Sequence, residues 1–282
     1  MAATSTTSYD AAVPSPGSDV VDDVGDAHAI GRSAASQWLD HPSYGATRRL
    51  DLTHRERACS RLVVVAAHPD DESLGAGGLI ATAAAAELSV YVVLLTAGEA
   101  SPFASPTSTR HALATLRLAE MENALARLAP ENYLVFLGAP DGEVTTAEDQ
   151  VAASLTELLG DGRRTLVAAP WRHDGHPDHD AAGRAAATAA RASGARLVEY
   201  PLLAWTYRSP DELPWQDVRC LALSPERQEQ KAAAIRSHVS QVRAGAGGSG
   251  STPPLPGRVL AHFHTPFEHF LEEPTTDQAS QE

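Results

Sequence analysis

Short apolar runs alternate with longer amphipathic stretches through the middle of the chain. The run RLVVVAA at 61–67 is apolar and rich in β-branched residues, as expected of a parallel strand covered on both faces. Further strands are predicted at 89–98, at 133–142 with its turn, and at 165–170, 195–200 and 218–223. Helices are predicted between them, at 73–87, 108–129, 147–159, 181–193 and 224–242. This alternation predicts an α/β fold in a single domain, with a Rossmann-like, mostly parallel sheet and helices on both faces.

The composition changes at both ends of this alternating region. The first 28 residues show no hydrophobic periodicity and contain no lysine or arginine, which is typical of a disordered segment. A short helix around GRSAASQWLDH is expected to dock on the body through Trp38. The predicted division is therefore a disordered acidic tail at 1–28, an N-terminal extension with this helix at 29–59, a globular domain at 60–272 with a flexible loop at 244–257, and an acidic tail at 273–282.

The charge of the chain argues against a nucleic-acid partner. The net charge is −14 over 282 residues, whereas nucleic-acid binding depends on basic patches. Nine unopposed acidic residues lie in the segments 1–28 and 272–282, and without them the body carries about −5. That is an ordinary value for a small domain. The acidity therefore indicates solvated ends of the chain rather than a type of substrate.

Cysteine usage and hydropathy narrow the class of protein. The two cysteines, Cys59 and Cys220, form no CxxC pair, so neither a disulfide framework nor a thiolate metal site is expected. No basic segment followed by an apolar one opens the chain, and no apolar run reaches the roughly 18 residues of a membrane span. We therefore expect a cytoplasmic protein without a membrane span, and the sequence leaves open whether it forms a homo-oligomer.

The first candidate site is the stretch AHPDDESLGAGG at 67–78, directly after the first predicted strand. Ligands of open parallel sheets bind beyond the carboxyl ends of the strands. Asp70 and Asp71 could cap the following helix, but a single aspartate would be enough for that. The glycines match neither GxGxxG nor GxxxxGK[ST], and the acids before them would repel a pyrophosphate. A cation would reverse the local charge, so the stretch favours a metal site.

A second cluster, WRHDGHPDHD at 171–180, follows the strand predicted at 165–170. Three histidines within seven residues make a merely hydrophilic loop a weak explanation. Carboxyl ends of parallel strands meet at one edge of a sheet, so both clusters are expected to converge there. Two imidazoles, one carboxylate and an open position for water are what catalytic zinc requires. His173 stays open as an alternative ligand to His176 or His179.

Together the two clusters resemble the PIG-L/LmbE family of zinc-dependent N-acetylglucosaminyl deacetylases, whose signature places HPDDE after one strand and HPDH after another. Here the two motifs read AHPDDESLGAGG and GHPDHDAAG. Further similar segments are LLTAGEA (94–100), RLAEMENALARL (117–128), FLGAPDG (136–142) and KAAAIRSHVSQV (231–242). The resemblance covers about residues 60–242. It implies a Rossmann-like fold, a zinc ion or another divalent metal, and removal of acetyl groups from N-acetylglucosaminyl compounds.

The resemblance also implies a role for nine individual residues. They are the metal ligands His68, Asp71 and His179, the catalytic residues Asp70, His176 and Asp178, and the substrate-binding residues Arg117, Asp141 and Glu99. Within the catalytic group, Asp70 is the general base and His176 protonates or polarises the substrate. Asp178 orients the His176 ring. Glu72 is left with two interpretations, since it either orients His68 or caps the helix.

The implied function is that of a metal-dependent hydrolase that removes the N-acetyl group from an N-acetylglucosamine-type amino sugar conjugate. Two alternatives stay open: an amidase of a larger acyl or thiol-sugar conjugate, and a non-catalytic module that binds a sugar or a metal. The loops 101–110 and 201–216, with Trp205, Tyr207 and Trp215, are expected to decide which acyl group or conjugate is accepted. The histidine-rich segment HFHTPFEHF at 262–270 is interpreted as C-terminal packing.

Overall fold

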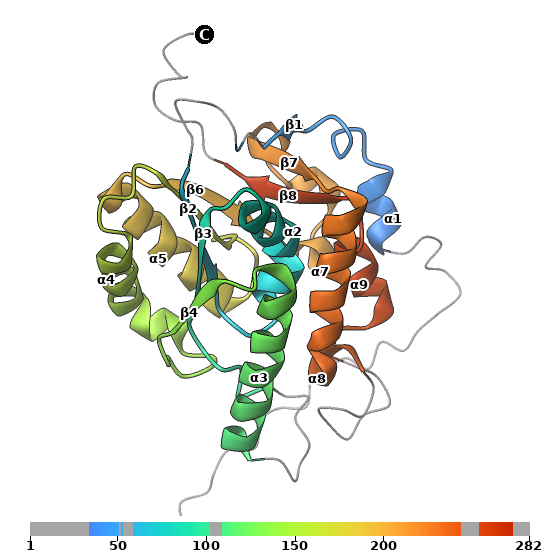
Figure 1. The fold of residues 1–282 in the computed structure, drawn as a ribbon. Helices are drawn as coiled ribbons and strands as arrows, with labels where there is room; N and C mark the ends of the chain where they lie inside the picture. The colour runs from blue at the N-terminus through green and yellow to red at the C-terminus, as the bar shows by residue number, and fades with distance from the viewer. Residues whose placement is uncertain (1–33, 51, 53–58, 102–108, 244–253, 273–282) are drawn as a thin grey trace, which may run out of the picture. The chain divides into compact units, whose positions relative to one another are not determined.

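The structure, a computed structural model, describes residues 34–50, 52, 59–101, 109–243 and 254–272. The tails predicted at 1–28 and 273–282 lie outside the described residues, as does most of the loop predicted at 244–257. Within the described part, helices pack around one mixed sheet (Figure 1).

Eight strands of the described residues form this sheet, in the order β1-β7-β8-β6-β5-β2-β3-β4. The strand β8 runs antiparallel to both of its neighbours, and the other neighbouring pairs are parallel. The strands are β1 (Arg48–Arg49), β2 (Arg61–Ala66), β3 (Ser89–Leu94), β4 (Asn132–Phe136), β5 (Thr165–Pro170), β6 (Arg196–Tyr200), β7 (Val218–Ala222) and β8 (Phe267–Leu271).

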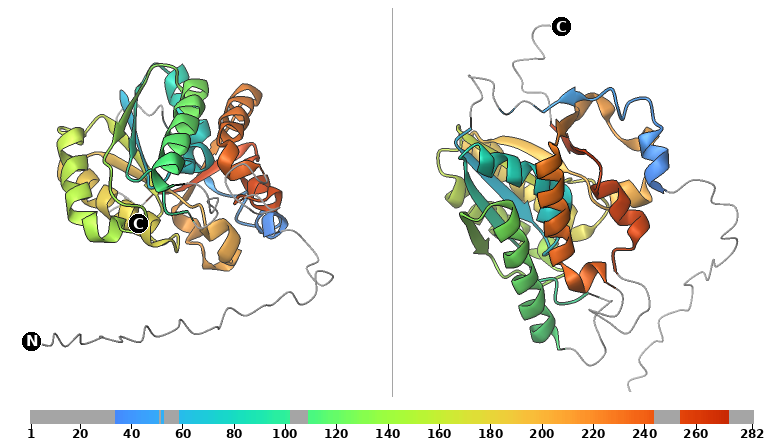
Figure 2. Two further views of the ribbon diagram at one scale, coloured as in Figure 1. Left: turned by 90° about the horizontal axis from the view of Figure 1, so that it is seen from below. Right: turned by 45° about the vertical axis from the view of Figure 1, so that its right-hand side comes forward.

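Helices cover both faces of the sheet, with α2, α3 and α7 on one face and α4 and α5 on the other (Figures 1 and 2). In β2, Val64 packs into the core under the first group, whereas Val63 and Val65 pack into the core under the second. Burial on both faces explains why β2 is continuously apolar. The helices are α1 (Ala34–Leu39), α2 (Asp71–Ala85), α3 (Arg110–Leu128), α4 (Glu148–Leu159), α5 (Pro177–Ser193), α6 (Ala204–Tyr207), α7 (Pro225–Ser237), α8 (Val239–Val242) and α9 (Gly257–Phe263), with short 3-10 turns at Val144–Ala147, Pro210–Glu212 and Trp215–Asp217.

The predicted α/β class with a mostly parallel sheet is confirmed. The segment 262–270 does pack in the core, with His262 and His269 buried, but it also supplies β8, which the sequence pattern does not predict. The helix predicted at 224–242 is interrupted at His238. The His238 side chain turns inward there, and its Nε2 lies 3.1 Å from the carboxylate of Glu72.

The short helix α1 is fixed to the rest of the described chain through Trp38. The Trp38 side chain is 1% exposed, and its indole Nε1 donates to the Trp205 carbonyl oxygen at 2.8 Å. The two indole rings meet edge to face, with centroids 4.7 Å apart. Trp205 stacks in turn on His262 of α9, with centroids 4.1 Å apart. The segments α1, α6 and α9 therefore pack as one layered group.

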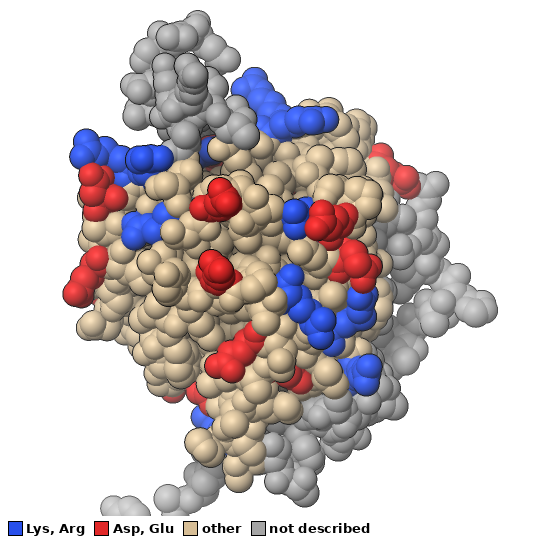
Figure 3. All heavy atoms as spheres, in the orientation of Figure 1, with Lys and Arg blue, Asp and Glu red and all other residues tan. Residues whose placement is uncertain are grey.

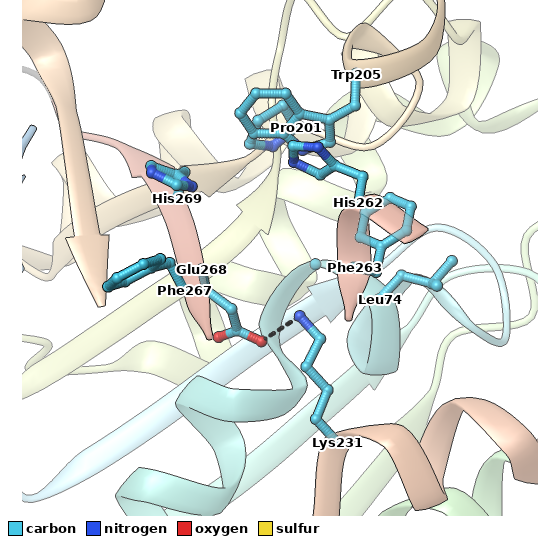
Figure 4. A pocket seen from close by; sticks show the side chains of 10 residues that line it. Leu74, Pro201, Trp205, Lys231, His262, Phe263, Phe267, Glu268 and His269 are labelled. Carbon is cyan, nitrogen blue, oxygen red and sulfur yellow. Dashed lines mark hydrogen bonds and ion pairs between the residues drawn. The ribbon is translucent and has the colours of Figure 1, made fainter. Parts of the chain in front are cut away.

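A buried ion pair between Lys231 and Glu268 ties α7 to β8 (Figure 4). The Glu268 carboxylate lies 2.7 Å from Lys231 Nζ, and it also accepts from the backbone amides of Gly78 and Leu79 at 2.6 and 2.8 Å. Those amides belong to the interior of α2. A side chain on Gly78 would overlap Leu223 and crowd Glu268, so the close approach of β8 to α2 requires glycine here.

Two histidines beside this ion pair are held in the neutral form. Burial, together with the neighbouring His269, lowers the pKa of His262 to about 3. Burial also lowers the pKa of His269 to about 4, although a hydrogen bond with the Tyr44 backbone acts to raise that pKa. Both rings lie around a small cavity that Figure 4 draws, together with Trp205. Each ring therefore resists taking up a proton in the folded state.

Stability toward acid is expected to depend on His262 and His269. Because their folded pKa values lie below the ordinary 6.5, the unfolded chain binds more protons, and stability is lost as pH falls from about 6.5 toward 4. At pH 5 the shifted pKa of each ring lowers the free energy of unfolding by about 2 kcal/mol. Urea unfolding at pH 7 and pH 5 measures how far the free energy of unfolding falls between these pH values. In His262→Phe, which keeps a ring against Trp205, this fall should be smaller than in the wild type by about 2 kcal/mol.

The exposed His111 on α3 offers a matched control for this measurement. His111→Phe makes the same chemical change at the surface, so its pH dependence should follow the wild type. An equal loss between pH 7 and pH 5 in wild type and His262→Phe would contradict the assignment of a buried neutral ring.

The surface drawn in Figure 3 carries acidic and basic side chains intermixed. Some form exposed pairs, such as Arg236 with Glu229 at 2.7 Å. Such pairs each contribute little to stability, about 0–1 kcal/mol. No helix in the described part of the chain has the length and apolar character needed to cross a membrane.

Candidate active site

The predicted site residues meet beyond the carboxyl ends of two neighbouring strands. His68 follows β2 and Asp71 opens α2, while His176 and His179 lie at the start of α5, after β5. Because β2 and β5 are hydrogen-bonded in parallel, the segments after them emerge side by side. All four side chains line one cavity of about 420 Å³. This volume is typical of a small-molecule site.

Three of these residues converge closely enough to hold one metal ion. The ligand atoms of His68, Asp71 and His179 lie within 4.8 Å of one another, and all three residues are buried. One oxygen of Asp71 is 3.4 Å from His179 Nε2, and the other is 3.8 Å from His68 Nδ1. Two imidazoles and a carboxylate form the donor set of many catalytic divalent-metal sites. An overlapping group combines His68 with His176 and Asp178.

A carboxylate holds the remaining nitrogen of each histidine ring. His179 Nδ1 lies 2.7 Å from Asp174, and His68 Nε2 lies 3.1 Å from both Asp141 and Asp178. Carboxylates in this position fix the orientation of an imidazole and leave its other nitrogen for a metal. The side chains therefore fit a divalent metal, with His179 Nε2 and His68 Nδ1 facing the Asp71 carboxylate.

The charges in the cluster shift the pKa values of its members. Burial by itself lowers the pKa of His68, but hydrogen bonds to Asp141 and Asp178 raise it to about 9. Burial likewise opposes charge on His179, but Asp71 raises its pKa well above the ordinary value. The Asp71 carboxyl is buried, yet the two imidazoles hold its pKa below the usual range. Since ligands must be deprotonated, a dication would displace protons from both rings on binding.

Asp70 occupies a strained backbone conformation at the start of α2. Its φ of 124° is one that residues other than glycine rarely adopt. It stands at the N-cap position but makes no capping hydrogen bond, so capping does not account for it. Its side chain instead lines the cavity, 3.4 Å from the Arg117 guanidinium. Burial raises the pKa of Asp70 to about 6, against the lowering effect of Arg117.

Asp178 is bonded to His176 through its backbone amide, while its carboxylate has other partners. The Asp178 carboxylate accepts from the amides of Gly142 and Val144 at 2.8 and 3.1 Å and contacts His68, not His176. His176 Nδ1 accepts instead from the Asp178 backbone amide at 3.1 Å. This bond leaves Nε2 to carry the hydrogen of the neutral ring. Burial and the neighbouring imidazoles lower the pKa of His176, which favours that neutral ring.

Two of the three predicted substrate-binding residues line the cavity. Arg117 and Asp141 line the cavity, but Glu99 is absent from its described lining. The Arg117 guanidinium is buried and donates to the carbonyl oxygens of Gly98 and Pro69 at 2.9 and 2.8 Å. Glu99 accepts from the Asp141 backbone amide at 3.0 Å. Arg117 and Asp141 therefore form part of the cavity wall, and Glu99 is bonded to one of them.

The alternative ligand His173 lies apart from the cluster, while an unpredicted residue lies within it. His173 is exposed, and its ring packs near Trp171 with centroids 5.7 Å apart. Asp174, to which the sequence pattern assigns no role, is buried against His179 and also accepts from the three backbone amides of residues 202–204 at 2.7–3.0 Å. In the sequence, only the position of Asp174 inside the histidine-rich motif could have pointed to this role. The amides that it binds follow a different strand.

Comparison with known proteins identifies the family. The family model described as PIG-L: GlcNAc-PI de-N-acetylase matches residues 63–190. A 1D-myo-inositol 2-acetamido-2-deoxy-alpha-D-glucopyranoside deacetylase of Actinosynnema mirum is 30% identical over 258 residues, which cover 75% of this chain and 91% of that protein. The chain belongs to the PIG-L family. Both candidate clusters of this PIG-L member, at 67–78 and 171–180, lie inside the matched residues 63–190.

Two further proteins are similar to this chain. A probable N-acetyl-alpha-D-glucosaminyl L-malate deacetylase 2 of Bacillus subtilis is 34% identical over 131 residues, which cover 44% of this chain. The chain spans little more than half of that relative, 58% of its length. Among solved structures, a conserved protein of Thermus thermophilus is 27% identical with a TM-score of 0.55, over 76% of this chain and 94% of that one.

In this PIG-L member, Glu72 holds the backbone of Asp70. The Glu72 side chain is fully buried, and one oxygen accepts from the Asp70 amide at 3.1 Å. The other oxygen accepts from the Ser73 hydroxyl at 2.7 Å and lies 3.1 Å from His238 Nε2. Burial lowers the pKa of His238, but Glu72 outweighs this and raises it. His238 thus contacts the carboxylate that supports the strained position of Asp70, and the raised pKa of its ring favours the charged form.

Proposed function

We propose that this chain is a metal-dependent hydrolase that removes the N-acetyl group from an N-acetylglucosamine-type amino sugar conjugate. The observation that carries the proposal is Asp70, a buried carboxyl with a raised pKa, beside a cluster of two imidazoles and a carboxylate in one cavity. A binding module has no need of such an acid–base group. Family membership and the named activity of the Actinosynnema mirum relative support the same reaction.

We assign zinc as the metal, held by His68, Asp71 and His179. The number and kind of donors match catalytic zinc sites, which keep a position open for water. When bound, the ion would polarise the amide carbonyl and make a water molecule more acidic. The carboxylates behind the two rings hold them in the orientation that this requires.

Asp174→Asn should have a graded effect that distinguishes a supporting carboxylate from a ligand. The Asp174 carboxylate lies 2.7 Å from His179 Nδ1, so its loss should weaken zinc affinity by about 10–100-fold without abolishing binding. Competition with a chromophoric chelator measures that affinity directly. Asp180→Asn, in the same motif but bonded to the Gly175 amide, should keep the wild-type affinity. A loss as complete as in His179→Ala would make Asp174 itself a ligand, and an unchanged affinity would remove it from the site.

Asp70 is assigned the role of general base. Its carboxyl lines the cavity next to Asp71 in the chain, where it can take the proton of the attacking water. Arg117 donates to the carbonyl oxygen of Pro69 at 2.8 Å and so steadies the backbone on that side. Glu72 steadies it on the other side through the Asp70 amide. The strained backbone of Asp70 is therefore supported from both sides.

His176 is assigned the role of stabilising the negative charge that develops on the amide oxygen. Because Nδ1 is engaged by a backbone amide, the neutral ring carries its hydrogen on Nε2. Such an N–H stabilises an oxyanion by donating a hydrogen bond. Burial and the neighbouring imidazoles lower the pKa of His176, which favours this polarising role over storage of a proton. The leaving amine then receives the proton that Asp70 took from water.

The proposal is tested with the full chain and a methyl N-acetylglucosaminide. Hydrolysis should release acetate and a free amine, stop when a chelator removes the metal, and resume when Zn²⁺ is added. Release of a larger acyl group but not of acetate would favour the amidase alternative. Binding of metal and sugar without any release of amine would favour the non-catalytic alternative.

Replacing Glu72 with glutamine should lower kcat by about 10–100-fold while the metal stays bound. The reason is the loss of a charge-assisted hydrogen-bond network worth about 1.5–3 kcal/mol, which allows Asp70 to relax from its strained backbone. Amine release and metal content should be measured on the same preparation. Glu131→Gln, at an exposed position, makes the same change away from the site and should leave kcat unchanged. A wild-type kcat in Glu72→Gln would contradict this positioning role.

A further inference from the structure

A break in the chain separates α7 from α8 at His238. The His238 backbone has φ −79° and ψ 62°, outside the α-helical region. In a continuous helix the Ser240 amide would donate to the Arg236 carbonyl oxygen, four residues earlier. His238 and Ser240 are both 1% exposed, so water does not replace that lost acceptor. The break therefore needs a polar partner from elsewhere in the fold.

Glu120 of α3 supplies this partner. The short helix α8 lies beside α3 (Figure 1). One oxygen of the Glu120 carboxylate accepts from the Ser240 amide at 2.7 Å, and the other accepts from the Ser240 hydroxyl at 2.6 Å. Glu120 is itself 6% exposed. Two short hydrogen bonds to a buried carboxylate fix the backbone of Ser240 more firmly than neutral bonds would.

The other side of the break carries the His238 ring. Its Nε2 lies 3.1 Å from both the Glu72 carboxylate and the Ser73 hydroxyl, in the first turn of α2. The second oxygen of Glu72 accepts from the Asp70 amide at 3.1 Å. Because Ser240 stands two residues after His238, fixing the Ser240 backbone also limits where the His238 ring can lie. A continuous buried connection therefore runs from Glu120 to the backbone of Asp70.

The helix α3 reaches Asp70 from a second direction, through Arg117. Arg117 precedes Glu120 by three residues, so the two side chains leave the helix on the same face. The Arg117 guanidinium donates to the Pro69 carbonyl oxygen at 2.8 Å and lies 3.4 Å from Asp70. With a φ of 124°, the Asp70 backbone keeps its conformation only if its surroundings hold it. The helix α3 thus contributes to the support on both sides of Asp70.

We infer that Glu120 and Ser240 are positioning residues for Asp70, because they hold the break between α7 and α8 where the His238 ring reaches Glu72. This inference rests on the proposed function, in which Asp70 is the general base. Neither Glu120 nor Ser240 belongs to the described lining of the cavity, so each acts only through other residues. If the two residues merely packed α8 on α3, their loss would lower stability and leave Asp70 unaffected.

Glu120→Gln should lower kcat by about tenfold, since it weakens two hydrogen bonds to a charged acceptor without changing the shape of the side chain. The measurement uses the full chain loaded with zinc and a methyl N-acetylglucosaminide, with metal content determined on the same preparation. Ser240→Ala removes only the hydroxyl bond and should lower kcat by about threefold. Glu122→Gln makes the same change at an exposed position on α3 and should keep the wild-type kcat. A wild-type kcat in both Glu120→Gln and Ser240→Ala would overturn the inference.

A double-mutant cycle shows whether Glu120 acts through Glu72. In Glu72→Gln the connection to Asp70 is already broken, so adding Glu120→Gln should lower kcat by less than about twofold more. A residue that only stabilises the fold, or that reaches Asp70 by another route, would lower kcat by the same factor in both backgrounds. Multiplication of the two separate effects would therefore contradict the inference.

Hydrogen exchange tests the connection without any activity. The segment 67–78 contains the Asp70 amide, whose acceptor is Glu72. Its amides should exchange about tenfold faster in Glu120→Gln and also faster in Ser240→Ala, while the segment 89–94 of β3 keeps its wild-type protection. Equal acceleration in both segments would indicate general destabilisation and would count against the inference. Ser240→Ala, the smaller change, gives the same information if Glu120→Gln does not fold.

The two measurements separate failure of the inference from failure of the proposed reaction. Faster exchange at 67–78 without hydrolysis by any preparation would refute the proposed function and retain the connection from Glu120 to Asp70. Hydrolysis at the wild-type rate in both variants, with unchanged exchange at 67–78, would retain the proposed function and refute the inference.

Discussion

Asp70→Asn is expected to lower kcat by about 10²–10⁴-fold, the usual contribution of a general base. Asparagine keeps the shape of aspartate and can still accept from Arg117, whose guanidinium lies 3.4 Å away. It has no means of taking the proton of water. The proposed metal ligands His68, Asp71 and His179 are unchanged, so one ion per chain should remain. Amine release and metal content measured on one preparation check both parts of the prediction.

The neighbouring residue supplies the matched control. Asp71→Asn makes the same chemical change one position along the chain, where the carboxylate faces both His68 and His179. It should weaken metal binding, whereas Asp70→Asn should not. His176→Ala should resemble Asp70→Asn, with metal kept and kcat reduced, because the N–H that we propose to stabilise the oxyanion is lost. A metal-free Asp70→Asn, or one that works at the wild-type rate, would contradict this division of roles.

The parallel strands could be predicted because both of their faces are covered. In β2, Val63 and Val64 belong to different cores, so the strand has no polar face and reads as one apolar run. The strand β8 could not be predicted in this way, because Glu268 and His269 are buried within it. Glu268 is satisfied by Lys231 and by backbone amides of α2, and no local pattern reveals such partners.

The residues of the site could be predicted better than their pairings. His68 and His179 each stand shortly after an apolar strand, so the edge of the sheet where they meet follows from the parallel order. The carboxylate of Asp178 was expected at the nearby His176, yet it contacts His68, 110 positions away. Glu72 is likewise paired with a histidine 166 positions away. Such contacts depend on how helices pack over the strand ends, which periodicity does not encode.

Loss of the metal is the expected result of His68→Ala, Asp71→Ala and His179→Ala. Each variant removes one of three donors that lie within 4.8 Å of one another, and the remaining two do not make a stable zinc site. Activity should fall with metal content, because the residues that move protons have no activated water to act on. Metal content per chain, measured after dialysis against metal-free buffer, checks the prediction on each purified variant.

His173→Ala is the matched control for the loss of metal. His173 belongs to the same histidine-rich motif as His179 but is exposed and lies apart from the cluster, so its variant should keep one ion per chain and the wild-type kcat. Metal loss in His173→Ala would make that ring a ligand after all. If His68→Ala, Asp71→Ala and His179→Ala all keep wild-type metal occupancy, the ligand assignment is wrong, and the overlapping group of His68, His176 and Asp178 becomes the alternative site.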